Sequence, residues 1–554
     1  MNMAQKILGI AVAAAILASV PLVASARIEG LTGPANPTFN FATGESHVIT
    51  GEGNSLLVWC FADLDNPGNK LKGVPQYPGP TLIVNEGDRV TIKLANTLSE
   101  PVSMVFPGLD VETPTSPIFS HGAKGNLTSI VPEAAPGGSQ TYVFRASRPG
   151  TFYYQSGSNQ DVQLRMGLYG AIIVRPTQTT TKTYTSVFPG HADQAGADPG
   201  PAGPAKVFTK FAYNEANVPD TISVGTPPVA ISNIGASTAY DREFLYLCSD
   251  MDPYFNAWME FGRDKTRSPA SYGDWIVNTA TQKKDFTTWK ANYWFINGRN
   301  APDTMGTDYD PNLPNQPYTI NVLFHPGEMA LTRFLNLGRD LHPIHTHGNH
   351  QRIVAEDGLI LSSAPVSPGE PAYATQTALT GADISVEEFT LTMSAGNTFD
   401  SIFNWTGKGL GWDAYGHKPG ATLLPYEYIA DHVTNGPATT LGPQFAQYGR
   451  YDNNQFVPPL ADGTVNLAAA QAAPTIAAPD PLVLTFGQWF SGSQYLGSSE
   501  PLPPTEVNLN LGGSSYYFMW HSHAEREIVN FNTFPGGMLT MAGIIPWSFN
   551  LPAE

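Results

Sequence analysis

The sequence predicts an all-β protein, and its composition carries this prediction. Gly (53 residues) and Pro (48 residues) are abundant, aromatic residues make up 11% of the chain, and charged residues make up only 14%. Long amphipathic helices need more Glu, Lys and Arg than this, whereas strands joined by Gly- and Pro-rich loops suit the mixture. A chain of 554 residues is also long enough for several domains with sizeable cores.

The first 26 residues read as a secretory signal peptide. Lys6 gives a positive start, residues 7–20 an apolar stretch, and Ala24-Ser25-Ala26 a cleavage site of small residues. A membrane anchor is the alternative, which Pro21 disfavours. We therefore expect an exported protein, periplasmic or extracellular, whose mature chain begins at Arg27 and keeps no transmembrane anchor.

The sequence after this segment contains patterns that predict individual strands. Residues 89–96 (RVTIKLAN) alternate polar and apolar side chains, which is the period of a half-buried strand. Residues 139–147 and 168–176 read as further strands, and no amphipathic helix of similar clarity is present. Turn and linker residues divide the mature chain into three β-rich units of unequal length: 27–176, 177–316 and 317–554. The third unit contains a long insertion at 361–515, whose role the sequence leaves open.

Charge and cysteine content limit the function classes. The net charge is −18 and no basic run occurs, which argues against nucleic acid as a partner. The only two cysteines, Cys60 and Cys248, would form a disulfide if adjacent in an oxidising compartment, or remain inert thiols if buried apart.

The densest chemistry is a set of histidines in two short segments. Two HxH pairs occur, one in HPIHTHG and one in WHSHAERE. Residues i and i+2 of a strand share one face, so the two pairs would converge if their strands were adjacent. Neutral imidazole binds copper, zinc, iron and nickel. The histidines of a single HxH pair are often core residues whose hydrogen bonds are satisfied without a metal. Two HxH pairs are a more specific signal, and they predict a metal site with the ligands His345, His347, His521 and His523.

These motifs, with others along the chain, resemble the multicopper oxidases. VPQYPGPTLIVNEGDRVTIKLANTL and GTFYYQSGSNQDVQLRMGLYGAIIV are similar to the two ends of that family's first domain. FLYLCSDMDP and YWFINGRNAPDT are similar to second-domain elements, and the two HxH motifs to the copper motifs of the third domain. The resemblance implies three cupredoxin-like Greek-key β-sandwich domains and copper as the cofactor, with zinc or no metal as alternatives.

The resemblance also shows which family ligands this sequence lacks. Where the first domain of the family has four histidines of the trinuclear copper–oxygen centre, this chain has Val105, Pro107, Gln155 and Gly157. The mononuclear blue-copper site of the family uses a histidine, a cysteine and a second histidine. By motif position these are His342, Ser522 and Glu527, and a serine hydroxyl cannot replace a thiolate that binds copper.

The sequence therefore predicts a retained metal site without the standard four-copper reduction of oxygen. The four HxH histidines would hold copper, His342 and Glu527 would add a second, harder site, and Glu525 and His350 would orient ligands. One-electron redox, peroxide chemistry, oxidation of a metal and simple metal capture remain open, as do catalysis, any small-molecule or metal substrate and the oligomeric state. The alternative is a metal-free cupredoxin scaffold that acts as a structural or interaction protein.

Overall fold

The structure is a computed structural model, and it describes fifteen stretches of the chain. They are residues 28–112, 120–121, 127–177, 179–184, 206–224, 226–261, 277–278, 283–284, 289–325, 327–364, 380–405, 450–452, 455–457, 516–545 and 551. The proposed signal segment, residues 1–26, and most of the insertion at 361–515 lie outside them.

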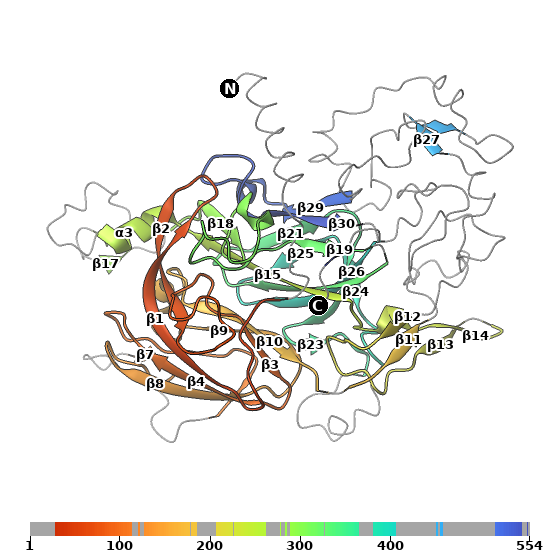
Figure 1. Ribbon diagram of the computed structural model, residues 1–554, viewed down its shortest axis with the longest axis horizontal. Helices are drawn as coiled ribbons and strands as arrows, with labels where there is room; N and C mark the ends of the chain where they lie inside the picture. Colours follow the sequence, from red (N-terminus) through yellow and green to blue (C-terminus); the bar gives the residue numbers. More distant parts are fainter. Residues whose placement is uncertain are drawn as a thin grey trace.

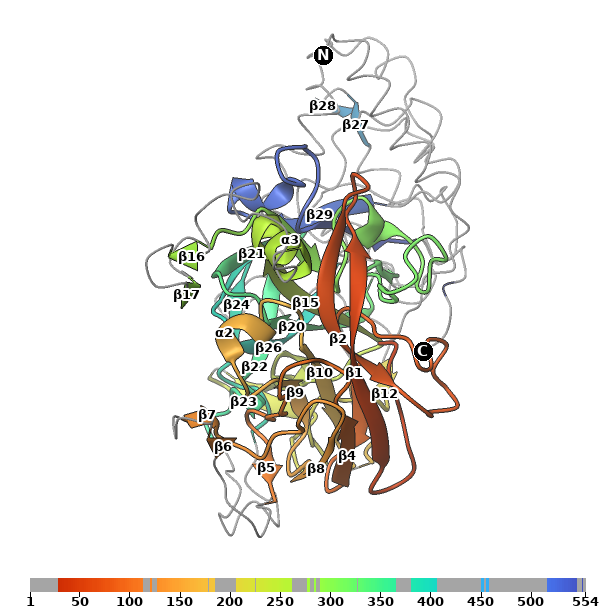
Figure 2. The same ribbon diagram turned by 90° about the vertical axis from the view of Figure 1, so that its left-hand side faces the viewer.

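The described chain is built mainly from strands, so the predicted all-β class is confirmed. The first sandwich pairs a five-stranded sheet, in the order β2-β1-β4-β8-β5, with a three-stranded sheet, β3-β10-β9 (Figures 1 and 2). The strands predicted at 89–96, 139–147 and 168–176 are β4, β8 and β10. The bounds are β1 (Thr38–Ile49), β2 (Ser55–Asp63), β3 (Leu82–Asn85), β4 (Arg89–Ala95), β5 (Asp110–Val111), β8 (Ser139–Arg145), β9 (Gly150–Gln155) and β10 (Tyr169–Arg175).

The second sandwich pairs a seven-stranded sheet with a five-stranded one. The larger sheet runs β18-β15-β20-β26-β22-β23, with β24 also on β22, and the smaller runs β19-β30-β29-β21-β25. The first group is β15 (Arg242–Met251), β18 (Tyr293–Ile296), β20 (Met329–Asn336), β22 (Gln351–Glu356), β23 (Leu359–Ile360), β24 (Val386–Glu388) and β26 (Thr398–Asn404). The second is β19 (Val322–Phe324), β21 (His342–Thr346), β25 (Thr390–Met393), β29 (Tyr516–Ser522) and β30 (Leu539–Ile544).

The larger sheet joins two units that the sequence separates. β15 lies before the predicted boundary at 316 and 317, and β20 lies after it, yet the two strands pair in parallel over seven residues. The main sheets of the described residues therefore form two sandwiches. The cupredoxin-like β-sandwich architecture agrees with the prediction, and the division into three units at 176 and 316 stays a prediction.

Short elements complete the described chain. Five two-stranded ribbons are β6 (Ser120–His121) with β7 (Leu127–Ser129), β11 (Lys182–Tyr184) with β12 (Lys206–Phe208), β13 (Thr221–Val224) with β14 (Val229–Ser232), β16 (Val277–Asn278) with β17 (Lys283–Lys284), and β27 (Arg450–Asp452) with β28 (Gln455–Val457). The helices are α2 (Gln160–Gln163), α3 (Pro253–Phe261), η2 (Ile234–Ala236), η5 (Asp303–Met305) and η8 (Glu525–Ile528). Among the described helices, none has the length and apolarity needed to cross a membrane.

Aromatic side chains fill the second sandwich beneath the histidine strands. The Trp520 ring of β29 lies 5.1 Å from the Phe403 ring and 6.5 Å from the Phe334 ring, both on the facing sheet. Trp520 and Phe403 are fully buried. Because Trp520 alternates with Met519 and His521 along the strand, its inward position turns the neighbouring His521 to the other face. The core thus determines which way the HxH motif points.

A buried charge network joins the two sandwiches. Arg333 of β20 is completely buried and lies 3.3 Å from a carboxylate oxygen of Glu243 and 3.3 Å from one of Asp400. Arg175 of β10, in the first sandwich, pairs with the same Glu243. Thr151 of β9 donates a hydrogen bond to Asp400 at 2.5 Å. Both sandwiches therefore depend on one set of compensated charges.

The two cysteines are free and buried. Burial raises the thiol pKa of both Cys60 and Cys248, which keeps them protonated and unreactive. The structure therefore agrees with the interpretation of inert, separate thiols and not with a disulfide.

Candidate metal centre

The two HxH segments lie on neighbouring antiparallel strands. In the register of β21 and β29, His345 faces His521 directly. Directly opposed residues of antiparallel strands have side chains on the same face, and the i+2 residues share that face. His347 follows the end of β21, and His523 follows the end of β29. The strand pairing thus brings the two motifs together as the sequence predicts.

The four imidazoles form one compact group. The ring of His345 lies 4.9 Å from that of His347, 5.5 Å from that of His521 and 4.7 Å from that of His523, measured between centroids. His347 and His521 approach most closely, with 3.2 Å between their Nε2 atoms. His345, His347 and His521 are buried and each offers a nitrogen within 4.8 Å of the other two. His523 is exposed and closes the group on its solvent side.

Hydrogen bonds orient two of these rings. The Nδ1 of His345 lies 2.6 Å from the Thr390 hydroxyl on β25, and the Nδ1 of His521 lies 2.7 Å from the carbonyl oxygen of Ser522. Such contacts at one ring nitrogen fix the orientation of a metal-binding histidine and leave its other nitrogen for the metal. The Nε2 of His345 is buried and has no hydrogen-bond partner among the described residues.

Burial keeps the imidazoles of His345, His347 and His521 neutral. It lowers the pKa of His345 to about 4 and that of His521 to about 4, with nearby imidazoles adding to the effect at both. Burial and the same neighbours lower the pKa of His347 even further. Neutral imidazoles present lone pairs at pH 7, which is the form that binds a metal ion.

This donor set fits copper. Nitrogens bound to one ion at about 2.0 Å lie roughly 3.3–3.5 Å apart. The three candidate nitrogens lie within 4.8 Å of one another, so they would move together by up to about 1.5 Å to share an ion. A site of imidazole nitrogens without thiolate suits copper, zinc, iron or nickel. The buried unpartnered Nε2 of His345 is the observation that favours a bound ion over a purely structural role.

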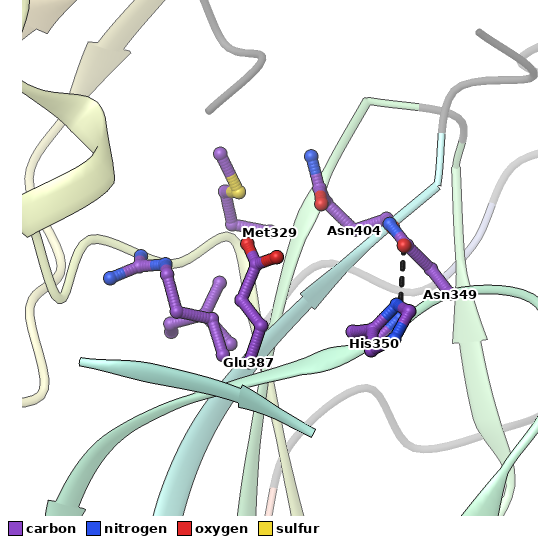
Figure 3. A pocket seen from close by; sticks show the side chains of 7 residues that line it. Met329, Asn349, His350, Glu387 and Asn404 are labelled. Carbon is purple, nitrogen blue, oxygen red and sulfur yellow. Dashed lines mark hydrogen bonds between the residues drawn. The ribbon is translucent and has the colours of Figure 1, made fainter. Parts of the chain in front are cut away.

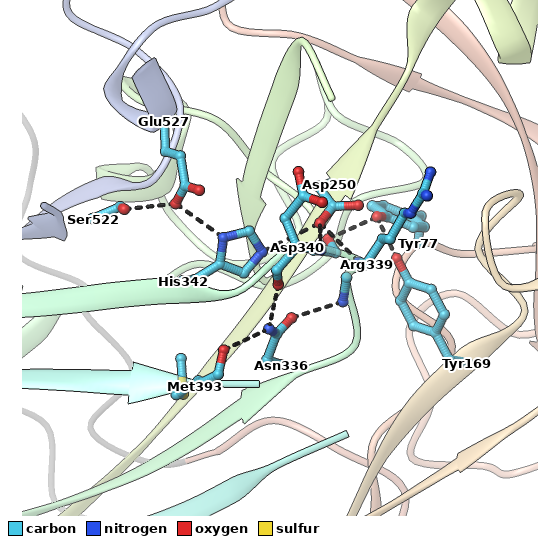
Figure 4. Close-up of polar contacts among 12 residues, drawn as sticks. Tyr77, Tyr169, Asp250, Asn336, Arg339, Asp340, His342, Met393, Ser522 and Glu527 are labelled. Carbon is cyan, nitrogen blue, oxygen red and sulfur yellow. Dashed lines mark hydrogen bonds and ion pairs between the residues drawn. The ribbon is translucent and has the colours of Figure 1, made fainter. Parts of the chain in front are cut away.

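The opposite face of β29 carries a different cluster. Ser522 points away from the imidazoles and donates a hydrogen bond of 2.6 Å to Glu527, as Figure 4 shows. The same Glu527 oxygen lies 2.9 Å from His342 Nδ1, and Asp250 lies 3.3 Å from His342 Nε2. Backbone amides of Arg339 and Asp340 donate to Asp250. Ser522 therefore lies on the side of β29 that faces His342 and Glu527.

In this structure His342 belongs to a buried ion cluster, and a second metal site at His342 and Glu527 stays a prediction. The two nitrogens of His342 face different carboxylates, so no single ion can bind the imidazole and both acids together. Burial alone would lower the pKa of His342, but the hydrogen bonds and charges of Asp250 and Glu527 outweigh it and raise the pKa to about 9. His342 is therefore an imidazolium at pH 7, in the place where the second, harder site was expected.

We expect the stability of the protein to fall at alkaline pH because of His342. A histidine whose pKa rises from 6.5 to about 9 on folding stabilises the fold fully below pH 6.5. That stability is lost as the pH rises through about 9, and the difference corresponds to about 3 kcal/mol. Denaturant unfolding at pH 6 and pH 10 would measure it. The variant His342→Gln should show a smaller pH dependence, and equal curves for the two proteins would contradict the assignment.

A second expectation concerns Ser522. The single variant Ser522→Cys adds a thiol, but it leaves His342 paired with two acids and no imidazole at position 527. We expect no intense blue thiolate–copper absorption from it after copper is added. Ser522→Cys combined with Glu527→His supplies the His₂Cys set of a blue-copper site and should gain that absorption. A blue single variant would show that His342 is available after all.

The structure brings together some of the four first-domain positions at which the family has histidines and this chain does not. Val105 and Gln155 exchange two backbone hydrogen bonds, of 2.8 and 3.1 Å. A Cβ atom at Gly157 would lie 2.8 Å from a Val105 methyl group and 2.9 Å from the Ser103 hydroxyl. A larger side chain at Gly157 would therefore require its neighbours to move. Three of these positions are close together, and none of them carries a ligand nitrogen of an imidazole.

His350 and Glu525, the two residues expected to orient the ligands, have different surroundings. His350 packs against Phe389, with 5.2 Å between ring centroids, and Phe389 packs against His345 at 5.5 Å. Glu525 is exposed and acts on His521 through its charge. Sequence reasoning missed Thr390, Phe389 and Asp250. Asp250 lies within FLYLCSDMDP, but no spacing rule connects it to His342 of a distant strand.

Comparisons with known proteins point to the same family as the sequence motifs do. Residues 72–179 match the family model described as multicopper oxidase. Laccase 1 of Metarhizium acridum is 37% identical over 112 residues, which are 20% of this chain and 17% of that protein. Multicopper oxidase MCE of Talaromyces pinophilus is 29% identical over 189 residues, 33% of this chain and 30% of that protein. The chain thus spans less than a third of the length of these relatives.

A solved blue copper oxidase from Nitrosomonas europaea aligns with 91% of this chain and 84% of its own, with a TM-score of 0.40 and 14% identity. The matched segment 72–179 contains the first-domain motifs on which the sequence resembles the multicopper oxidases. Residues 72–179 are thus similar to the multicopper oxidases, a family whose cofactor is copper.

Proposed function

We propose that this protein is an exported copper-binding relative of the multicopper oxidases that does not carry out four-copper oxygen reduction. Its ligands would be His345, His347 and His521, with His523 as the fourth. The observation that carries the proposal is the convergence of three buried imidazoles, with ligand nitrogens within 4.8 Å of one another.

The residues support a copper role that differs from that of a laccase. Reduction of oxygen to water needs four electrons, and the first-domain positions that would complete the usual centre lack imidazoles. Ser522 and the ion-paired His342 offer no thiolate route for electrons to the histidines. Bound copper would supply one-electron redox chemistry. The chain itself holds three neutral, buried nitrogens and leaves one side of the group, at His523, open to solvent.

A metal-free scaffold is the second candidate. The hydrogen bonds of His345 to Thr390 and of His521 to Ser522 are also those of structural histidines in a β-sheet. In that case the protein would act through its surface, as a structural or interaction component.

Purification from the native compartment tests both candidates. Metal analysis by mass spectrometry should give stoichiometric copper, and electron paramagnetic resonance should give a nitrogen-rich signal without a blue-copper signature. Protein that is metal-free, folded and inert to added copper would favour the scaffold. Sequencing of the mature N-terminus should give Arg27, and an intact first 26 residues would contradict export by signal cleavage.

A further inference from the structure

Different residues surround the histidines on the two strands of the candidate metal centre. On the side of β21, His350 lines a small polar pocket, and its backbone amide donates to the Asn349 side chain at 2.9 Å (Figure 3). Phe389 lies against both His350 and His345, at 5.2 and 5.5 Å between ring centroids. On the side of β29, the contacts with the histidines come from Ser522.

Ser522 lies between His521 and His523 and contacts both faces of its strand. Its carbonyl oxygen lies 2.7 Å from Nδ1 of His521, on the imidazole side. Its hydroxyl donates a hydrogen bond of 2.6 Å to Glu527, on the opposite side (Figure 4). The side chain is completely buried. One residue thus joins the imidazole cluster to the ion cluster of His342 and Glu527.

The carbonyl contact determines which nitrogen of His521 carries the proton. Burial lowers the pKa of His521 to about 4, so at pH 7 the ring is neutral and has one N–H group. A carbonyl oxygen can only accept a hydrogen bond, so the proton lies on Nδ1, which donates to Ser522. The lone pair is then on Nε2, the atom that lies 3.2 Å from Nε2 of His347. The Ser522 carbonyl thereby directs a metal-binding nitrogen of His521 into the cluster.

The hydroxyl of Ser522 also fixes the chain around the next histidine. It accepts a hydrogen bond of 3.2 Å from the backbone amide of Ala524, two residues further on. Serine and threonine hydroxyls form short turns in this way, and this turn encloses His523. The amide of His523 itself donates to the carbonyl oxygen of Pro343 on β21 at 2.8 Å. The backbone is therefore held on both sides of His523.

Glu527 gives this turn a fixed support. The same carboxylate oxygen that accepts from Ser522 lies 2.9 Å from Nδ1 of His342, and the Glu527 amide donates to the carbonyl oxygen of Ala524 at 2.7 Å. Gly537 lets the returning chain approach closely, because its φ is +59° and a Cβ atom there would overlap the Glu527 carbonyl. The support comes from the protein alone, so His521 and His523 are oriented before an ion arrives.

We propose that Ser522 is a positioning residue of the metal centre. Anchored on Glu527 by its hydroxyl, it holds His521 in the tautomer that offers Nε2 to an ion, and it holds His523 at the exposed side of the cluster. The inference deepens the proposed function and rests on it, because copper is the ion that these histidines would bind. A thiol is a weaker donor and acceptor than a hydroxyl, so the serine has a role of its own at this position.

The test compares Ser522→Ala with the wild type, first without metal. NMR of the full-length, metal-free protein with isotope-labelled histidine nitrogens should show His521 protonated on Nδ1 in the wild type and a mixture of tautomers in the variant. The variant should fold, because Glu527 keeps its pairing with His342. It should also bind cupric ion about tenfold more weakly, with a changed nitrogen hyperfine pattern in electron paramagnetic resonance.

Ser156 provides a matched control in the first sandwich. It is completely buried, and its hydroxyl donates to Gln163 and accepts from the amide of Ser158, two residues further on, at 3.1 Å. Ser156→Ala therefore removes the same kinds of contact. It should leave both the tautomer of His521 and the copper signal unchanged.

A conservative variant and the metal-free measurement separate the possible failures. Glu527→Gln keeps an oxygen that accepts from Ser522, so it should retain the wild-type tautomer of His521. If the wild type binds no copper, the proposed function fails, whereas the tautomer without metal still decides the role of Ser522. A tautomer that is the same in the wild type and in Ser522→Ala, or that changes equally in Ser156→Ala, would overturn the positioning role.

Discussion

Replacing His347 and His521 together by alanine should abolish stoichiometric copper binding. These two residues have the closest pair of ligand nitrogens in the cluster, 3.2 Å apart, and both rings are buried. Their loss leaves His345 and the exposed His523, which cannot enclose an ion. We expect affinity for copper to fall by at least about a hundredfold, or more than about 3 kcal/mol. Mass spectrometry of the purified variant and a chelator competition assay would measure the loss.

His47 provides a matched control for this experiment. It lies in the first sandwich, about half exposed, 3.1 Å from Glu260. His47→Ala should retain the full copper content of the wild type. If the double variant keeps its copper while remaining folded by circular dichroism, the ligands lie elsewhere and the histidine cluster is structural.

The largest loss of stability should come from Arg333→Ala. Arg333 is completely buried between Glu243 and Asp400. Its removal leaves buried carboxylates without their compensating charge, which typically costs about 3–5 kcal/mol. The free energy of unfolding, measured by denaturant titration, should fall by about this amount.

Two comparisons isolate the cause of that loss. Arg89→Ala removes a solvent-exposed partner of Glu112 and should produce no measurable change. Adding Asp400→Asn to Arg333→Ala removes one of the uncompensated charges and should recover part of the lost stability. If Arg333→Ala unfolds no more easily than Arg89→Ala, the network carries little of the stability that joins the sandwiches.

Much of the fold was predictable because strand alternation is a local signal. The alternation of Val90, Ile92 and Leu94 correctly located β4, since one face of that strand is buried. The parallel pairing of β15 with β20 was not predictable in this way. It joins segments about 90 residues apart, and no local pattern determines which strand lies beside which.

The same distinction applies to the site. The spacing of the HxH pairs placed four imidazoles on one face, and the alternation correctly turned Ser522 to the other. The ion pair of His342 with Asp250 could not be anticipated, because it depends on the distant strand β15. The support of His345 by Thr390 likewise requires the pairing of β21 with β25.

The strand order of the smaller sheet has a consequence for the folding sequence. β29 lies at the centre of β19-β30-β29-β21-β25, between strands that precede it by far in the chain and β30, which follows it. His347 and His521 are 174 residues apart in sequence, so pairing β21 with β29 brings together distant parts of the chain at an entropic cost. During synthesis, the earlier ligands on β21 must wait for residues 516–545 before a copper-binding geometry exists. A nascent chain that stops short of β29 would leave one edge of β21 unpaired and two histidines without their partners, so the histidine cluster assembles late in the folding of the second sandwich.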